Sequence, residues 1–130
     1  MPLTRYLLLA LVVAGPAAAT PPLLSAVTGH NVVAMMFAPG ADDPQFDQQA
    51  SELAKLSTQP AFRSLTVVGV AGGTVMGASD TASALRARFG VAPKSFRFII
   101  LGLDGQVALS QGSVASEDRI AQAIKATPQQ

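Results

Sequence analysis

The sequence of 130 residues contains no cysteine and no tryptophan, and it has a single histidine. Without a thiol the chain can form no disulfide, catalyse no thiol–disulfide exchange and offer no thiolate to a metal ion. One imidazole, that of His30, cannot build a multi-histidine metal site. We therefore expect His30 to be an ordinary surface residue, and we expect no cofactor and no metal site.

Charged residues are also scarce, because they make up 13% of the chain, and the net charge is +1. If residues 1–19 are removed, nine basic residues less Arg5 leave eight, against eight acidic residues. A neutral domain without a basic stripe is a poor candidate for binding nucleic acid or an anionic membrane surface. We expect neither as a partner. A protein partner would be periplasmic or extracellular, because the N-terminal residues have the pattern of an export signal.

The most apolar run lies near the N-terminus and has the organisation of a signal peptide. Arg5 supplies a positive charge, residues 7–13 are apolar, and the alanines at 17–19 form a small-residue cleavage site. An uncleaved anchor is less favoured, because the run is much shorter than the roughly 20 residues that span a bilayer. We predict that residues 1–19 are a signal peptide cleaved after Ala19, and that the protein is periplasmic or secreted.

The rest of the chain divides into a lead-in, one domain and a tail. Residues 20–30 contain two prolines and a short apolar patch, so we expect a flexible lead-in whose apolar side chains dock on the domain edge. Residues 31–126 show the succession of strand and helix patterns of a single α/β domain. Residues 127–130 are expected to fray. A domain of this size is large enough for an independent core.

The domain opens with a buried strand, a turn and an amphipathic helix. Residues 31–37 are apolar on both faces, which is typical of an interior parallel strand. Met35 and Met36 are neighbours in this strand and point to opposite faces, so core packing is favoured over soft-metal binding. Asp43 is placed to cap a helix over residues 44–57, whose first residue is a proline, the position where a missing N–H costs nothing.

Three more strands and two more helices follow. The predicted strands cover residues 65–70, 96–101 and 106–110, and the predicted helices cover residues 81–89 and 117–125. Ser79 or Asp80 is placed to cap the first of these helices, and Ser116 the second. Asp104 and Gly105 between the last two strands are a strong hairpin signal. We predict the order β-α-β-α-β-β-α, a mixed four-stranded sheet with helices on both faces and a parallel first pair of strands.

This element order resembles the thioredoxin fold without its usual first strand and helix. Thioredoxins carry two cysteines flanking two residues, the second often proline, at the start of the helix after the central strand. The corresponding residues here are Asp42, Asp43, Pro44 and Gln45. The proline is retained, while Asp42 and Gln45 stand where the cysteines would be. The resemblance therefore implies a thioredoxin-like domain without redox activity.

A narrower resemblance is to the DUF4174 family of small exported thioredoxin-like domains. It covers about residues 30–124 and is carried by residues 32–39, 42–44, 65–70, 89–91 and 96–105. The family usually has a lysine before Asp-Gly in the hairpin and a basic residue shortly after it, but this chain has Leu103 and Ala108. The family's methionine–proline–arginine ending is also missing. The resemblance implies a binding or accessory module of undefined function, with little basic surface at the hairpin.

The turn over residues 38–45 is the surface that we predict to bind a partner. In the thioredoxin layout the segment before the third strand approaches this turn and brings Lys94 and Arg97 with it. A charge in an apolar strand needs a partner, so either cation is placed to pair with Asp42 or Asp43. The alternative is that Arg97 lies on a solvent-facing edge. The predicted binding residues are Asp42, Asp43, Pro44, Gln45, Lys94 and Arg97.

Two other functions are left open by the residues. Paired carboxylates such as Asp42 and Asp43 work as acid and base in hydrolases and other enzymes, but no nucleophile accompanies them, and helix capping is the favoured role. The glycine-rich segment 72–79 lies between a strand and a helix, as a phosphate-binding loop does, but Ala78 stands where the lysine would be. Weak anion capture at the helix N-terminus, as in a small-ligand carrier, is the remaining alternative.

Overall fold

The computed structural model describes residues 21–62 and 64–126, so the predicted signal peptide and the predicted tail lie outside the described residues. The elements are α2 (Leu24–Val27), β1 (Val33–Ala38), α3 (Pro44–Ser57), the 3-10 helix η1 (Pro60–Phe62), β2 (Thr66–Ala71), β3 (Thr74–Met76), α4 (Ala82–Phe89), β4 (Arg97–Leu101), β5 (Val107–Gln111) and α5 (Glu117–Lys125). None of these helices has the length and apolar character needed to cross a membrane.

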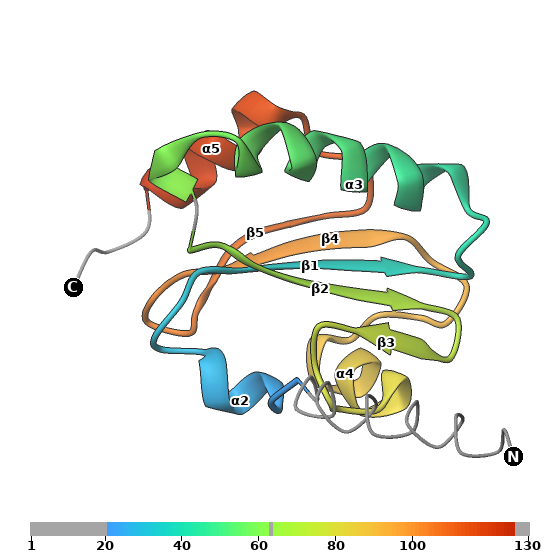
Figure 1. Cartoon of the computed structure of the whole chain (residues 1–130). Coiled ribbons are helices and arrows are strands. Elements are labelled where there is room, and N and C mark those ends of the chain that lie inside the picture. Colours follow the sequence, from blue (N-terminus) through green and yellow to red (C-terminus); the bar gives the residue numbers. More distant parts are fainter. Residues whose placement is uncertain (1–20, 63, 127–130) are drawn as a thin grey trace, which may run out of the picture.

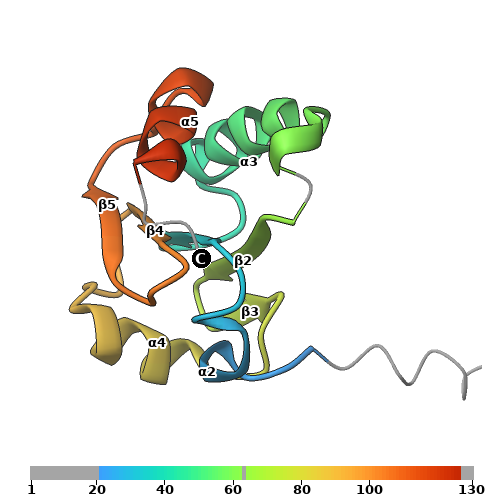
Figure 2. The same ribbon diagram turned by 90° about the vertical axis from the view of Figure 1, so that its left-hand side faces the viewer.

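Five strands form one mixed sheet in the spatial order β3-β2-β1-β4-β5. Strands β1 and β2 are parallel, and the other neighbouring pairs are antiparallel. Helices α3 and α5 cover one face of the sheet, and α2 and α4 lie on the other (Figure 1, Figure 2). The predicted mixed α/β domain, its parallel first pair and its final hairpin are confirmed. The predicted number of four strands is wrong by one.

The additional strand, β3, lies in the segment that we predicted to be a glycine-rich loop. Gly72 and Gly73 form a two-residue turn after β2, and Gly72 has the positive φ (59°) that such turns require. Residues 74–76 then pair in an antiparallel manner with residues 69–71. Strand pairing thus involves residues 74–76, the middle of the segment that the sequence likened to a phosphate-binding loop.

The central strand β1 separates two apolar clusters. Met36 belongs to the cluster beneath α3 and α5, together with Phe46 and Ile120. Met35 belongs to the cluster on the opposite face, together with Leu85 of α4. Both methionine side chains are buried. The prediction that they are core residues on opposite faces of the sheet is therefore confirmed.

The segment that we predicted to be a flexible lead-in contains the short helix α2. Leu24 of this helix is completely buried. The carboxylate of Asp80 accepts a hydrogen bond from the Leu24 N–H at 2.7 Å and so caps α2 from a distant part of the chain. Neither Ser79 nor Asp80 caps α4, as the sequence had suggested. The Thr81 hydroxyl takes that place and accepts a hydrogen bond from the Ala84 N–H.

Polar side chains join α3 to the start of α5. Gln49 of α3 is completely buried, and its amide bonds both backbone groups of Ala115: Nε2 donates to the carbonyl oxygen at 3.0 Å, and Oε1 accepts from the N–H at 2.7 Å. Glu52, further along the helix, accepts a hydrogen bond from the Glu117 N–H at 2.7 Å. Gln49 thus makes the two hydrogen bonds to Ala115 that a neighbouring strand would otherwise make, and Glu52 caps α5.

The contact made by Glu52 should depend on pH. The hydrogen bond from Lys55, followed by the one from the Glu117 N–H, holds the pKa of Glu52 below its usual value of 4.5. A carboxyl whose pKa is lowered by folding stabilises the fold fully above its unfolded pKa, and this contribution is lost as the pH falls through the folded pKa. We therefore expect Glu52→Gln to lower the melting temperature at neutral pH and to have little effect in acid.

Circular dichroism melts from about pH 6 to about pH 2 would measure this difference, since the range begins above the usual pKa of a glutamate and extends well below it. Asp47→Asn is the matched control, because Asp47 is an exposed acid on the same helix. A difference between wild type and Glu52→Gln that stays constant over the whole range would show that ionisation of Glu52 does not contribute to stability.

Candidate functional site

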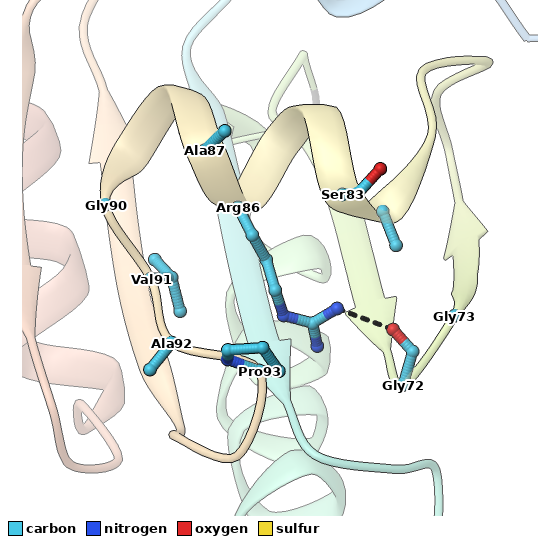
Figure 3. A pocket seen from close by; sticks show the side chains of 10 residues that line it. Gly72, Gly73, Ser83, Arg86, Ala87, Gly90, Val91, Ala92 and Pro93 are labelled. Atoms are coloured by element: carbon cyan, nitrogen blue, oxygen red, sulfur yellow. Dashed lines mark hydrogen bonds between the residues drawn. The ribbon is translucent and has the colours of Figure 1, made fainter.

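A cleft opens at the end of the sheet where the parallel strands β1 and β2 finish. It has a volume of about 640 Å³ and lies between α4, the turn after β2 and the segment that follows α4 (Figure 3). In open α/β sheets, ligands bind in the crevice outside the carboxyl ends of the strands. The lining residues are Gly72, Gly73, Ala82, Ser83, Arg86, Ala87, Gly90, Val91, Ala92 and Pro93.

Helix α4 brings one charged side chain into this cleft. Arg86 is only 8% exposed and lies on the same side of the helix as the buried Ala82. Its side chain crosses the cleft, so that the guanidinium lies between Gly72 and Pro93 (Figure 3). Gly90 ends the helix in the left-handed conformation, with φ 67°, and the chain then returns along the cleft.

The guanidinium of Arg86 holds the ends of two strands together. Nη1 donates a hydrogen bond to the Gly72 carbonyl oxygen at 2.6 Å, and Nη2 donates one to the Ala38 carbonyl oxygen at 2.8 Å. Ala38 is the last residue of β1, and Gly72 directly follows β2. The Gly72 N–H also donates to the Ala38 carbonyl at 3.1 Å. Arg86 therefore ties α4 to the carboxyl ends of both parallel strands.

The positive charge of Arg86 has no anionic partner within the part of the chain that the structure describes. The ion pair found there joins Lys55 and Glu52, and the Arg86 Nε is buried without a hydrogen-bond partner. Burying a charge is costly unless it is paired, and two carbonyl dipoles do not cancel a full charge. The cleft therefore contains a buried cation that an anionic group would neutralise.

The other lining residues are mostly apolar and offer few reactive groups. Ser83 provides the one hydroxyl among the lining side chains, and none of them is an acid or an imidazole. General acid–base catalysis requires a titratable group within hydrogen-bond reach of the substrate. Among the described residues, no three histidine or carboxylate side chains lie close enough to hold a metal ion. This arrangement is suited to recognition of a ligand more than to proton transfer.

Of the four residues predicted on the turn after β1, Asp43, Pro44 and Gln45 form the start of α3. Asp43 accepts a hydrogen bond from the Gln45 N–H at 2.8 Å, and Pro44 occupies the first helical position. Asp42 is exposed beside them. None of the four lines the cleft. Their turn borders it, because the carbonyl oxygen at the end of β1 is bonded to the buried guanidinium.

The two predicted cations do not meet these carboxylates. Arg97 is half-buried at the start of β4, and its Nη1 donates a hydrogen bond to the Ser110 hydroxyl at 2.9 Å, on the edge strand β5. Lys94 is exposed between α4 and β4. Neither cation forms an ion pair with Asp42 or Asp43, all four being described residues. The predicted pairing is therefore replaced by a hydrogen bond within the β4–β5 hairpin.

Arg86 was not selected from the sequence, although a signal for it exists. Ala82, Arg86 and Phe89 follow one another at helical spacing, which puts the arginine on the apolar face of the predicted helix. A charged side chain on a buried face needs a partner. An arginine among apolar helix positions therefore indicates a candidate site. The partners themselves could not be found in this way, because the carbonyl groups of Ala38 and Gly72 are backbone atoms that any residue would supply.

Comparisons with known proteins bear on the family and on the fold. A family model described as "Domain of unknown function (DUF4174)" matches residues 23–130. No curated protein matches the chain significantly. The chain is similar to a solved structure titled "Structure of a malarial protein", with a TM-score of 0.56 and 18% sequence identity, over 74% of this chain and 96% of that one. At that identity the likeness concerns the fold alone.

Proposed function

Because the chain belongs to the DUF4174 family, we propose that it is an exported, thioredoxin-like domain without redox activity that acts as a binding or accessory module. The family description assigns no function, so the proposal depends on the residues of this chain. The pattern of residues 1–19 supports export to the periplasm or secretion. Because the 130 residues include no cysteine, thiol redox chemistry is excluded.

The thioredoxin-like part of the proposal is supported by the neighbours of the central strand. β1 pairs in parallel with β2 after the crossover helix α3, and it pairs in an antiparallel manner with β4 of the final hairpin. Helix α5 then packs on the same face as α3 (Figure 2). This succession agrees with the thioredoxin layout that the sequence suggested, with β3 as an addition at the edge beside β2.

The observation that carries the binding role is the cleft beneath α4, with its unpaired buried guanidinium. A cavity with apolar walls and a few convergent polar groups is the usual form of a small-molecule site. We place the binding surface in this cleft and on the bordering turn, residues 38–45. The enzymatic alternative has less support, since the Asp43 carboxylate is engaged in capping α3 and the lining of the cleft contains no acid.

The proposal can be tested by an amide NMR titration of the purified protein with cell-envelope extract, separated into small molecules and macromolecules. We expect shifts confined to residues 38–45, 72–73 and 82–93. The same titration of Ala87→Leu, which places a larger side chain in the cleft, should give a much smaller response. Ala84→Leu is the matched control, because Ala84 is exposed on the same helix and does not line the cleft.

Three results would contradict a binding module that uses this cleft. The first is chemical conversion of an extract component by the protein, which would favour an enzyme. The second is a response centred on other residues. The third is an equal response from Ala87→Leu and Ala84→Leu, which would show that the bound molecule does not enter the cleft.

A further inference from the structure

We propose that the cleft beneath α4 binds an organic carboxylate with an apolar body, and that its carboxylate neutralises the Arg86 guanidinium. This inference rests on the proposed binding function and adds the chemical class of the ligand. Its basis is the combination of one unpaired buried cation with walls of small apolar side chains.

The guanidinium has unused hydrogen-bond donors. An arginine side chain carries five N–H bonds in a planar fork. Two hydrogen bonds, to the carbonyl oxygens of Gly72 and Ala38, are made by Nη1 and Nη2. Three N–H bonds remain, including that of Nε, which is buried without a partner. These carbonyl contacts hold the guanidinium in position before any ligand arrives, so that little side-chain freedom is lost on binding.

The remaining donors fit a carboxylate better than a phosphate. A carboxylate is planar, carries one charge and accepts two parallel hydrogen bonds from a guanidinium. A phosphate dianion carries up to two charges and needs more donors around it. Among the lining residues Arg86 is the one cation and Ser83 the one hydroxyl. Charge balance in the cleft therefore favours a monoanion.

The walls determine the rest of the ligand. Ala82, Ala87, Val91, Ala92 and Pro93 offer carbon surface and no hydrogen-bonding side chains. A sugar or a nucleotide would lose its hydration here without replacement, and burying such polar groups unpaired is unfavourable. An alkyl chain or an apolar side chain loses nothing by entering. The ligand class is therefore a carboxylate attached to an apolar body.

Two sources supply this chemistry: a free carboxylic acid, and the C-terminal carboxylate of a peptide that ends in an apolar residue. The probes that separate them are hexanoate and N-acetyl-alanyl-leucine, each compared with its uncharged amide. Acetate tests the need for an apolar body, and inorganic phosphate tests the preference for a carboxylate. The readout is the ¹⁵N-¹H signal of the Arg86 Nε–H, identified by its disappearance in Arg86→Lys.

We expect the Arg86 Nε–H signal to shift on addition of at least one of the two carboxylates. Each carboxylate should bind about ten- to a hundredfold more tightly than its amide, the range expected for loss of a charged hydrogen bond. Acetate and phosphate should bind more weakly than hexanoate. Tighter binding of the peptide than of hexanoate would assign the site to chain termini, and the reverse would assign it to free acids.

Two variants that leave Arg86 in place test the inference even if substitution of Arg86 disturbs the fold. Ala87→Leu narrows the cleft without touching the guanidinium and should weaken hexanoate binding, whereas Ala84→Leu should not. The proposal is overturned if neither carboxylate binds, if acid and amide bind equally, if phosphate binds more tightly, or if the two leucine variants behave alike. A cleft that responds to the small-molecule extract but not to carboxylates would overturn only the ligand class and leave the binding function standing.

Discussion

Replacing Gln49 with leucine is expected to lower the free energy of unfolding by about 2–6 kcal/mol, because two buried backbone groups lose their partner and each costs roughly 1–3 kcal/mol. The Gln49 amide pairs with both the N–H and the carbonyl of Ala115, and Ala115 is 1% exposed. Leucine has a similar volume but cannot make either hydrogen bond. The loss would be a large share of the stability of about 5–15 kcal/mol that a domain of this size has.

Urea unfolding followed by circular dichroism would measure this loss. The matched control is Gln48→Leu, since Gln48 is the neighbouring glutamine of α3 and is exposed. We expect the control to change stability by less than about 0.5 kcal/mol, as is usual for surface positions. If Gln49→Leu were as stable as Gln48→Leu, the side-chain pairing with Ala115 would contribute nothing, and the apolar packing between α3 and α5 would suffice.

Replacing Gly77 with alanine is expected to lower the free energy of unfolding by about 2–5 kcal/mol, as the sum of backbone strain and overpacking. Gly77 follows β3 and has a φ of 89°, which side chains other than that of glycine rarely adopt. An added Cβ would overlap the carbonyl oxygen of Val67 and approach the Val68 Cα to 3.4 Å. Because the obstacle is backbone of β2, it cannot be relieved by rotation of a side chain.

Gly73→Ala provides the matched control, because Gly73 lies in the turn before β3 and an added Cβ would have no heavy atom within 4 Å. We expect this variant to be neutral, or more stable by up to about 1 kcal/mol through the reduced freedom of the unfolded chain. Thermal unfolding of both variants would decide the matter. Equal melting temperatures would mean that the chain at Gly77 can move away from β2 at little cost.

The parts of the fold that could be predicted from the sequence are those specified by neighbouring residues. Asp43 and the proline after it mark the start of α3, and the structure has this helix at the predicted residues 44–57. Strand β3 was missed because it has three residues, too few for a periodicity to be recognised. Asp80 was assigned to the wrong helix because its partner, Leu24, is brought to it only by the folded domain.

The same distinction applies to the candidate site. Segments that line or border the cleft had been selected from the sequence for their glycines, prolines and acidic residues. What joins them is Arg86, and its contacts are with backbone carbonyl groups, one of which lies 48 residues away in the chain. Such contacts cannot be predicted from the pattern of side chains along the sequence. The one indication in the sequence was a charged residue on an apolar helix face. It identifies Arg86 but not the groups to which Arg86 is hydrogen-bonded.

The central place of β1 in the sheet has a consequence for the order in which the chain can assemble. Val33 of β1 pairs with Thr66 of β2, and Phe37 pairs with Arg97 of β4, so this strand has no local partner. Closing such long loops lowers the entropy of the chain before the strands make any stabilising contact, and this slows folding. A nascent chain therefore cannot complete the pairing of β1 until β4 has been synthesised. Until then neither apolar cluster can close, because β4 contributes Phe98 and Ile100 to one and Ile99 and Leu101 to the other.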